Sequence, residues 1–125
     1  MNNKYSDNEL REMLITFIED ANRIMCKIEN EIDPLEIKED YKNLKKKVKD
    51  EAHRVDLQDN RKNATEFEKR YYTPAVQGAS AWGFTVSTNS KVNKDMYRAV
   101  EEAHYKLSKY ISLEELKKME FSDRI

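Results

Sequence analysis

Histidine and cysteine, the side chains that most often bind transition metals, are rare in this chain of 125 residues, which has two histidines and one cysteine. His53 lies in the segment DEAHRVD, but no second histidine or cysteine follows it at a spacing that a metal site would use. Helical zinc and di-iron sites are built on such paired ligands. We therefore predict no metal site.

The patterns that mark nucleophilic catalysis and phosphate binding are also missing. With only two glycines, the sequence has no glycine-rich loop that could cradle a phosphate and no dinucleotide-binding fingerprint. No serine has both flanking glycines of a nucleophile elbow. We therefore predict no cofactor and no enzyme of these classes.

One arginine–histidine pair stands near the C-terminus, in Arg98-Ala-Val-Glu-Glu-Ala-His104 followed by Tyr105. This pattern resembles the signature of the HEPN superfamily, small helical bundles of which many are metal-independent ribonucleases. The resemblance covers only these few residues, and it implies that His104 transfers a proton while Arg98 acts on the scissile phosphate. Six residues along a regular helix turn two side chains about 120° apart. This use of the pair therefore requires a broken helix or a second chain; otherwise Arg98 is solvated and His104 flanks the core.

The segment YYTPAVQGASAWGFTVSTNS, residues 71–90, differs from the charged sequence around it. It holds both glycines, one of the two prolines and the only tryptophan. Small residues let backbones approach closely, so we expect a short helix wedged between longer ones, with Trp82 and Phe84 in the core. In the alternative interpretation the segment lines a pocket or an interface, because aromatic side chains anchor interfaces and stack on nucleobases. The candidate binding residues are then Arg70, Tyr71, Tyr72, Trp82, Phe84 and Arg98.

Charge is distributed unevenly although the total is −1. Residues 1–41 carry 5 basic and 11 acidic side chains, whereas residues 42–72 carry 10 basic and 6 acidic ones. We expect neighbouring antiparallel helices to pair these charges. In the alternative, a basic strip within residues 42–54 follows a nucleic-acid backbone. The lysines that share a helix surface there are Lys42, Lys45, Lys46 and Lys49.

Length and composition predict one helical domain over residues 1–125, with frayed ends at 1–5 and 121–125. Hydrophobic and charged residues each make up 38% of the chain, so the core must lie on stripes. A single cysteine allows no internal disulfide, which favours a cytoplasmic protein. No apolar run approaches the ~18 residues of a membrane span, and we expect no membrane partner.

Apolar spacing predicts a long helical hairpin in the first half of the chain. Ser6 and Glu9 have the capping-box spacing that opens a helix. Asp33 and Pro34, with Glu36, end this helix and open the next one, and the short turn makes the two antiparallel. The core-facing stripes are expected at Leu10, Leu14, Phe17, Ala21, Ile24 and Ile28, and at Ile37, Tyr41, Leu44, Val48, Ala52 and Val55.

The segment 56–63 is rich in Asp and Asn and is predicted to form a turn. Asn63 and Glu66 would then cap a third helical segment. One continuous helix over residues 34–72 is the alternative, because the segment contains neither glycine nor proline.

Thr73 before Pro74 is the second cap-and-proline pair, and it is expected to open a short helix. That helix should stop at Gly83 in a left-handed conformation. The β-branched residues in 84–87 favour an extended piece.

The last long helix is expected to begin at a cap on Asn89 or Ser90, and Ser112 with Glu115 should cap a final short helix. The stripe of the long helix is expected at Val92, Met96, Ala99, Val100, Ala103, Leu107, Tyr110 and Ile111.

These elements predict an all-α fold: a bundle of about four helices on a long antiparallel helix hairpin, with an irregular aromatic connector at residues 73–90. We expect a non-enzymatic binding or regulatory protein that acts through protein–protein contacts. An inhibitor, an immunity protein or an antagonist from a bacterial phage or mobile element would have these features. Two alternatives stay open: a metal-independent ribonuclease using Arg98 and His104, and a nucleotide-binding protein with a pocket at residues 71–90. The expected partner is a protein; a homodimer, a nucleotide or RNA are the other possibilities.

Overall fold

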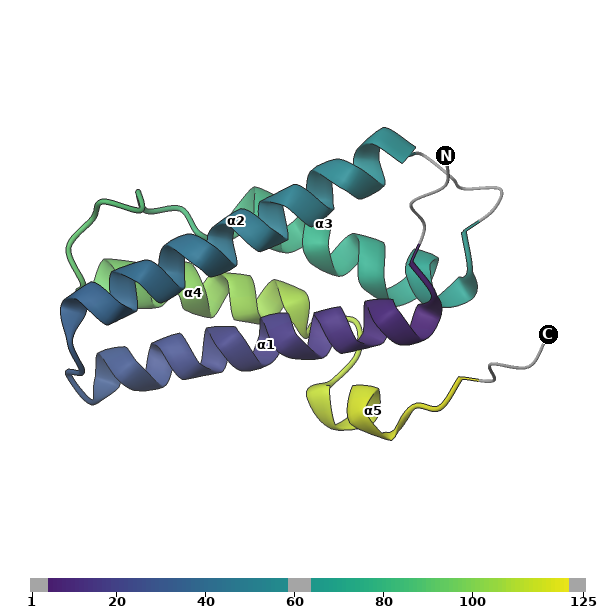
Figure 1. The fold of residues 1–125 in the computed structure, drawn as a ribbon, viewed down its shortest axis with the longest axis horizontal. Helices are drawn as coiled ribbons and strands as arrows, with labels where there is room; N and C mark the ends of the chain where they lie inside the picture. The colour runs from purple at the N-terminus through teal and green to yellow at the C-terminus, as the bar shows by residue number, and fades with distance from the viewer. Residues whose placement is uncertain (1–4, 59–63, 122–125) are drawn as a thin grey trace.

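The protein is an all-α bundle, as the sequence predicts. A computed structural model describes residues 5–58 and 64–121, in which no strand occurs (Figure 1). Its elements are α1 (Asp7–Glu29), α2 (Pro34–Gln58), the π-helical turn η1 (Glu68–Tyr72), α3 (Thr73–Trp82), α4 (Lys94–Leu107) and α5 (Leu113–Lys118). Helix α1 packs on α2 and α4, and α3 packs on the same two helices, which closes a four-helix ring; α5 lies against α1. No described helix is long and apolar enough to cross a membrane.

The predicted hairpin forms the frame of the bundle. The capping box of Ser6 and Glu9 is present at the start of α1, and α2 begins at Pro34. Asp33 accepts a hydrogen bond from the Leu35 backbone N–H at 3.0 Å. Within the stripes, Ile28, Ala52 and Val55 are half-buried. The fully buried members are Leu10, Leu14, Phe17, Ala21, Ile24, Ile37, Tyr41, Leu44 and Val48.

The helix breaks after α2 as predicted, and the single helix over 34–72 is wrong, because residues 64 and 65 are not helical. The predicted turn at 56–63 begins too early, because α2 runs through Gln58 and residues 59–63 lie outside the described residues. The proposed cap Asn63 lies outside the described residues. A capping arrangement forms at Thr65 and Glu68 instead: the Thr65 hydroxyl accepts the Glu68 N–H at 3.2 Å, and the Glu68 carboxylate accepts the Thr65 N–H at 3.0 Å. The Thr65 hydroxyl also donates to Asp7 at 2.6 Å, which ties this start to α1.

The predicted cap at Thr73 is wrong, because Thr73 has helical backbone angles and the helix runs through Pro74 from residue 66 to Trp82. The Thr73 N–H donates to the Glu68 carbonyl, five residues back, in a π-helical turn. Proline lacks an N–H, and its ring crowds the carbonyl four residues before it. Widening the preceding turn is one way in which a helix accommodates this residue. The irregular part of the connector is therefore 83–93 and not 73–90.

Gly83 ends α3 by close packing and not by a left-handed turn, so that prediction is wrong. Its φ is −102°, whereas the positive φ of 55° belongs to Phe84. A Cβ on Gly83 would stand 2.6 Å from the Cα of Ala103 and 2.8 Å from the carbonyl oxygen of Ala79. The Phe84 N–H donates to the Ala99 carbonyl at 3.0 Å, which fixes the chain to α4.

Helix α4 begins later than the sequence indicates. Its N-cap is Asn93, whose side chain accepts the N–H groups of Asp95 and Met96, so the predicted caps at Asn89 and Ser90 are wrong. The helix ends at Leu107, which leaves Tyr110 outside it and exposed. The predicted capping box at the start of α5 is present. The buried residues of the α4 stripe are Met96, Ala99, Val100, Ala103 and Leu107.

Candidate functional site

The structure separates the two aromatic residues that were expected to lie together in the core. Phe84 is buried, with its ring edge-on to Tyr41 at a centroid distance of 5.8 Å. Trp82 is 65% exposed, so its expected place in the core is wrong. Trp82 is the last residue of α3, whereas Phe84 follows Gly83 and turns back onto α4.

Trp82, Tyr105 and Lys106 form an exposed surface where α3 meets α4, which we call the α3–α4 aromatic surface. Lys106 Nζ lies 5.8 Å from the ring centroids of both Trp82 and Tyr105, a distance at which a cation interacts with a ring face. Tyr105 is 55% exposed. The stem of Lys106 passes over Gly78, where an added Cβ would be 3.6 Å away. The lysine that lies beside both rings thus packs along α3 at Gly78.

The candidate residues of the π-helical turn, Arg70, Tyr71 and Tyr72, do not contact one common site. Arg70 is exposed, with its guanidinium carbon 5.6 Å from the ring centroid of the half-buried Tyr71. Tyr71 packs on Phe67 at 5.7 Å. Tyr72 is fully buried, and its hydroxyl reaches Glu51 of α2. The structure therefore does not gather the candidate residues of this turn with Trp82 into one pocket.

Arg98 and His104 lie on one unbroken helix, α4. At six residues' separation their side chains leave a regular helix about 120° apart. Arg98 is exposed, and His104 is half-buried. Burial lowers the pKa of His104, against the opposing effect of the nearby Glu101 carboxylate. The break that would let the pair converge within one chain is not present in α4.

A buried polar cluster that the sequence analysis did not identify connects α2 with the π-helical turn. Glu51 is only 9% exposed, and its carboxylate accepts the Tyr72 hydroxyl at 2.6 Å and the Arg54 Nη2 group at 2.7 Å. Burial, followed by the hydrogen bond to Glu51, raises the pKa of Tyr72, so the hydroxyl keeps its proton. A signal for the cluster exists in the sequence, because Glu51 falls on the apolar stripe between Val48 and Val55.

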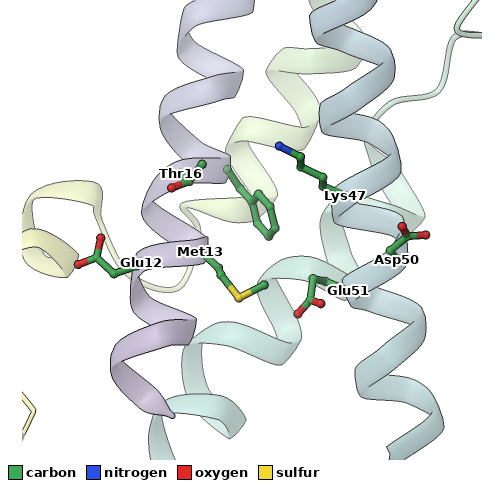
Figure 2. A pocket seen from close by; sticks show the side chains of 7 residues that line it. Glu12, Met13, Thr16, Lys47, Asp50 and Glu51 are labelled. Atoms are coloured by element: carbon green, nitrogen blue, oxygen red, sulfur yellow. The ribbon is translucent and has the colours of Figure 1, made fainter. Parts of the chain in front are cut away.

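Glu51 also lines a groove of about 430 Å³ between α1 and α2. Figure 2 shows Lys47 and Glu51 reaching into the space between the helices from α2, and Met13 reaching into it from α1. Glu12 and Asp50 point away from this space. The lining residues are Glu12, Met13, Thr16 and Phe17 of α1 and Lys47, Asp50 and Glu51 of α2.

Two lysines of the predicted basic strip fasten the connector to α2. Lys45 Nζ donates to the Val86 carbonyl at 3.0 Å, and Lys49 Nζ donates to the Ser80 carbonyl in the last turn of α3 at 2.9 Å. Burial, and then the nearby charge of Lys49, lower the pKa of Lys45. The Tyr41 hydroxyl also donates to Val86, at 2.7 Å, and burial raises its pKa to about 12.

The ion pairs found between α1 and α2 differ from the predicted complementarity of an acidic first and a basic second helix. Among the described residues, Lys27 of α1 supplies the base, at 2.7 Å from Glu36 and 2.6 Å from Asp40 of α2. Both carboxylates raise the pKa of Lys27, Asp40 more strongly than Glu36. Because Glu36 faces Lys27, it is engaged away from the capping role that its spacing indicates.

Within the described residues, no group of three or more His, Cys, Asp and Glu side chains is placed to hold a metal ion. Comparison with known proteins found no matching family model, no matching curated protein and no matching solved structure.

Proposed function

We propose that this protein is a non-enzymatic binding protein that recognises a partner protein through the α3–α4 aromatic surface. The observation that supports the proposal is the exposure of Trp82 and Tyr105, 65% and 55%, around one lysine. Tryptophan and tyrosine are among the residues that contribute most to the affinity of protein interfaces. The apolar surface of the exposed Trp82 ring is removed from water, which is favourable, when a partner covers it.

The chemistry of α3 supports the same proposal. No residue of Thr73–Trp82 is charged, although 38% of the whole chain is. A partner that covers α3 therefore desolvates no charge on that helix, whereas desolvated charges are costly unless they are paired. Lys106 stands beside the rings and supplies one cation at the edge of the uncharged helix.

The nucleotide-pocket alternative has less support. It needs a cavity bounded by Tyr72, Trp82 or Phe84, yet Tyr72 and Phe84 belong to the core. The three pockets described among residues 5–58 and 64–121 take no lining residue from 71–90. The ribonuclease alternative needs a second chain, because α4 is unbroken between Arg98 and His104.

Affinity capture with matched variants tests the proposal. The immobilised protein, its Trp82→Ala variant and its Leu35→Ala variant are exposed to extract of the cells that carry the gene, and the captured protein is then purified and titrated. Leu35 is 75% exposed on α2 and serves as the control for loss of an exposed apolar side chain. Truncating a central anchor costs about 2 kcal/mol or more, so we expect Trp82→Ala to weaken binding roughly 30-fold. Equal affinities of Trp82→Ala and Leu35→Ala would refute the proposal.

A further inference from the structure

The groove between α1 and α2 has Lys47 and Glu51 on its α2 wall and the apolar side chains of Met13 and Phe17 on its α1 wall. Lys47 and Glu51 lie one helical turn apart, about 6 Å along α2, and both reach into the groove (Figure 2). Met13 and Phe17 of α1 line it opposite them, also one turn apart. Its volume of about 430 Å³ falls in the range of small-molecule sites.

The two oxygens of the Glu51 carboxylate accept different numbers of hydrogen bonds within the protein. Its Oε1 atom accepts the Tyr72 hydroxyl at 2.6 Å and Arg54 Nη2 at 2.7 Å. Its Oε2 atom accepts Arg54 Nε at 3.0 Å, and the same N–H is shared with Oε1 at 3.1 Å. A carboxylate oxygen can accept two hydrogen bonds, so Oε2 retains capacity for a further donor.

Fold stability alone does not account for this arrangement. Buried ion pairs are often no more stabilising than apolar residues of the same size, because the desolvation of the charges offsets their attraction. Tyr72 reaches Glu51 from the π-helical turn before Pro74 and fixes the carboxylate beside the groove. A buried carboxylate fixed by two donors beside a cavity is thus a candidate ligand-binding group.

The charges at the groove leave one cation without a partner. Glu12 is paired with Arg11 at 2.8 Å, and Asp50 is paired with Lys46 at 2.8 Å. Among the described residues, Lys47 makes no ion pair and no hydrogen bond from its ammonium group, which points into the groove in Figure 2. The groove therefore offers a cation at one end and an acceptor at the other.

We propose that the groove binds a small zwitterion with an apolar body, of the chemical class of an apolar α-amino acid. The anionic group of the ligand pairs with Lys47, an N–H donor bonds Glu51 Oε2, and the apolar body lies against Met13 and Phe17. This site is separate from the α3–α4 aromatic surface and does not rest on it.

Three small molecules with the same ring separate the contributions of the two ends: phenylalanine, 3-phenylpropionate, which lacks the donor, and phenethylamine, which lacks the anion. The readout is the ¹³C-methyl resonance of Met13 in the groove, with Met96, fully buried in the core, as the internal control. We expect phenylalanine to shift the Met13 signal saturably in the millimolar range and to leave the Met96 signal in place. Each of the two incomplete molecules should bind about fivefold more weakly, the upper end of the effect of losing one partly exposed ion pair.

Lys47→Gln is the variant that tests the cation, since Lys47 is exposed and its replacement should leave the fold intact. Lys42→Gln makes the same charge change at an exposed lysine of α2 that does not line the groove. We expect Lys47→Gln to weaken phenylalanine about fivefold and Lys42→Gln to leave its affinity unchanged. An unmoved Met13 signal at 50 mM phenylalanine, on the order of ten times the expected dissociation constant, equal binding to the two variants, or phenethylamine binding as tightly as phenylalanine would each overturn the proposal.

Discussion

Replacing Gly83 by alanine should destabilise the bundle, because the chain at this glycine lies close against the backbone of α4. The added Cβ would lie 2.6 Å from both the Cα and the Cβ of Ala103 and 2.8 Å from the carbonyl oxygen of Ala79. Ala103 belongs to α4, so α3 and α4 must separate to relieve the two contacts with this residue. The backbone itself is not strained by alanine, since φ is −102° and ψ is 176°, an extended conformation open to any residue.

The magnitude follows from two opposing effects. Overpacking a close-packed site costs about 1–3 kcal/mol, and contacts with immobile backbone atoms place Gly83→Ala in the upper half of that range. Alanine also reduces the conformational entropy of the unfolded chain, which returns about 0.4–1 kcal/mol. The expected net loss is about 2 kcal/mol in the free energy of unfolding. In a domain of this size that corresponds to a fall in Tm of about 6–10 °C.

Gly78→Ala is the matched control, because these are the only two glycines in the chain and an added Cβ at either one would face a residue of α4. A Cβ on Gly78 would meet only side-chain carbons of Lys106, at 3.6 Å or more, which is ordinary contact. Gly78 lies inside α3, where alanine is favoured over glycine by up to about 1 kcal/mol. Urea unfolding followed by circular dichroism gives the free energy of unfolding of both variants and of the wild type. A Gly83→Ala protein as stable as the wild type, or a Gly78→Ala protein destabilised to the same extent, would refute the packing argument.

Three further perturbations test other contacts. Tyr72→Phe removes the hydroxyl that donates to the buried Glu51, and urea unfolding should show a loss of about 1–3 kcal/mol; an unchanged midpoint would mean that the carboxylate does not need this donor. Thr65→Ala removes the cap of the third helical segment and the bond to Asp7, and should cost about 1 kcal/mol, against no loss for the exposed Thr85→Ala. The pKa of His104 is lowered in the folded protein, so the unfolded chain binds the extra proton first and stability should fall as pH drops below about 6.5. His104→Gln should flatten this part of the stability–pH curve, and parallel curves for the two proteins would contradict the assignment.

Helix starts that are set by a capping motif in the adjacent sequence could be predicted. The start of α1 could be predicted because Ser6 and Glu9 complete a capping box within four residues. The same holds for α5 at Ser112. The apolar stripes of α1 and α2 are equally local, since their spacing alone selects the buried face.

The connector could not be predicted in the same way, because tertiary contacts choose among equivalent local signals. Asn89, Ser90 and Asn93 are all good N-cap residues, and the chain uses Asn93. Two hydrogen bonds hold the segment before Asn93 against other helices. The Phe84 N–H donates to the Ala99 carbonyl of α4, and the Val86 carbonyl accepts the Tyr41 hydroxyl of α2. These contacts set where residues 83–93 run and thus where α4 can begin.

The candidate site residues also depend partly on local sequence signals and partly on tertiary contacts. A threonine before a proline indicates a cap, but here the π-helical turn lets the helix pass through both residues. Trp82 and Phe84 are equally aromatic, and only the end of α3 at Trp82 places one in solvent and the other in the core. The Glu51 cluster has a visible signal, a carboxylate within an apolar stripe, but its partner Tyr72 comes from a distant turn.

Trp82 itself offers the most direct test of the proposed interface, since it is the only tryptophan in the chain. Protein labelled with 5-fluorotryptophan has a single fluorine resonance, which reports on the α3–α4 aromatic surface alone. We predict that this resonance shifts and broadens when the captured partner is added, and that it loses its sensitivity to the solvent. A partner that binds while the resonance keeps its position and width would contradict the account.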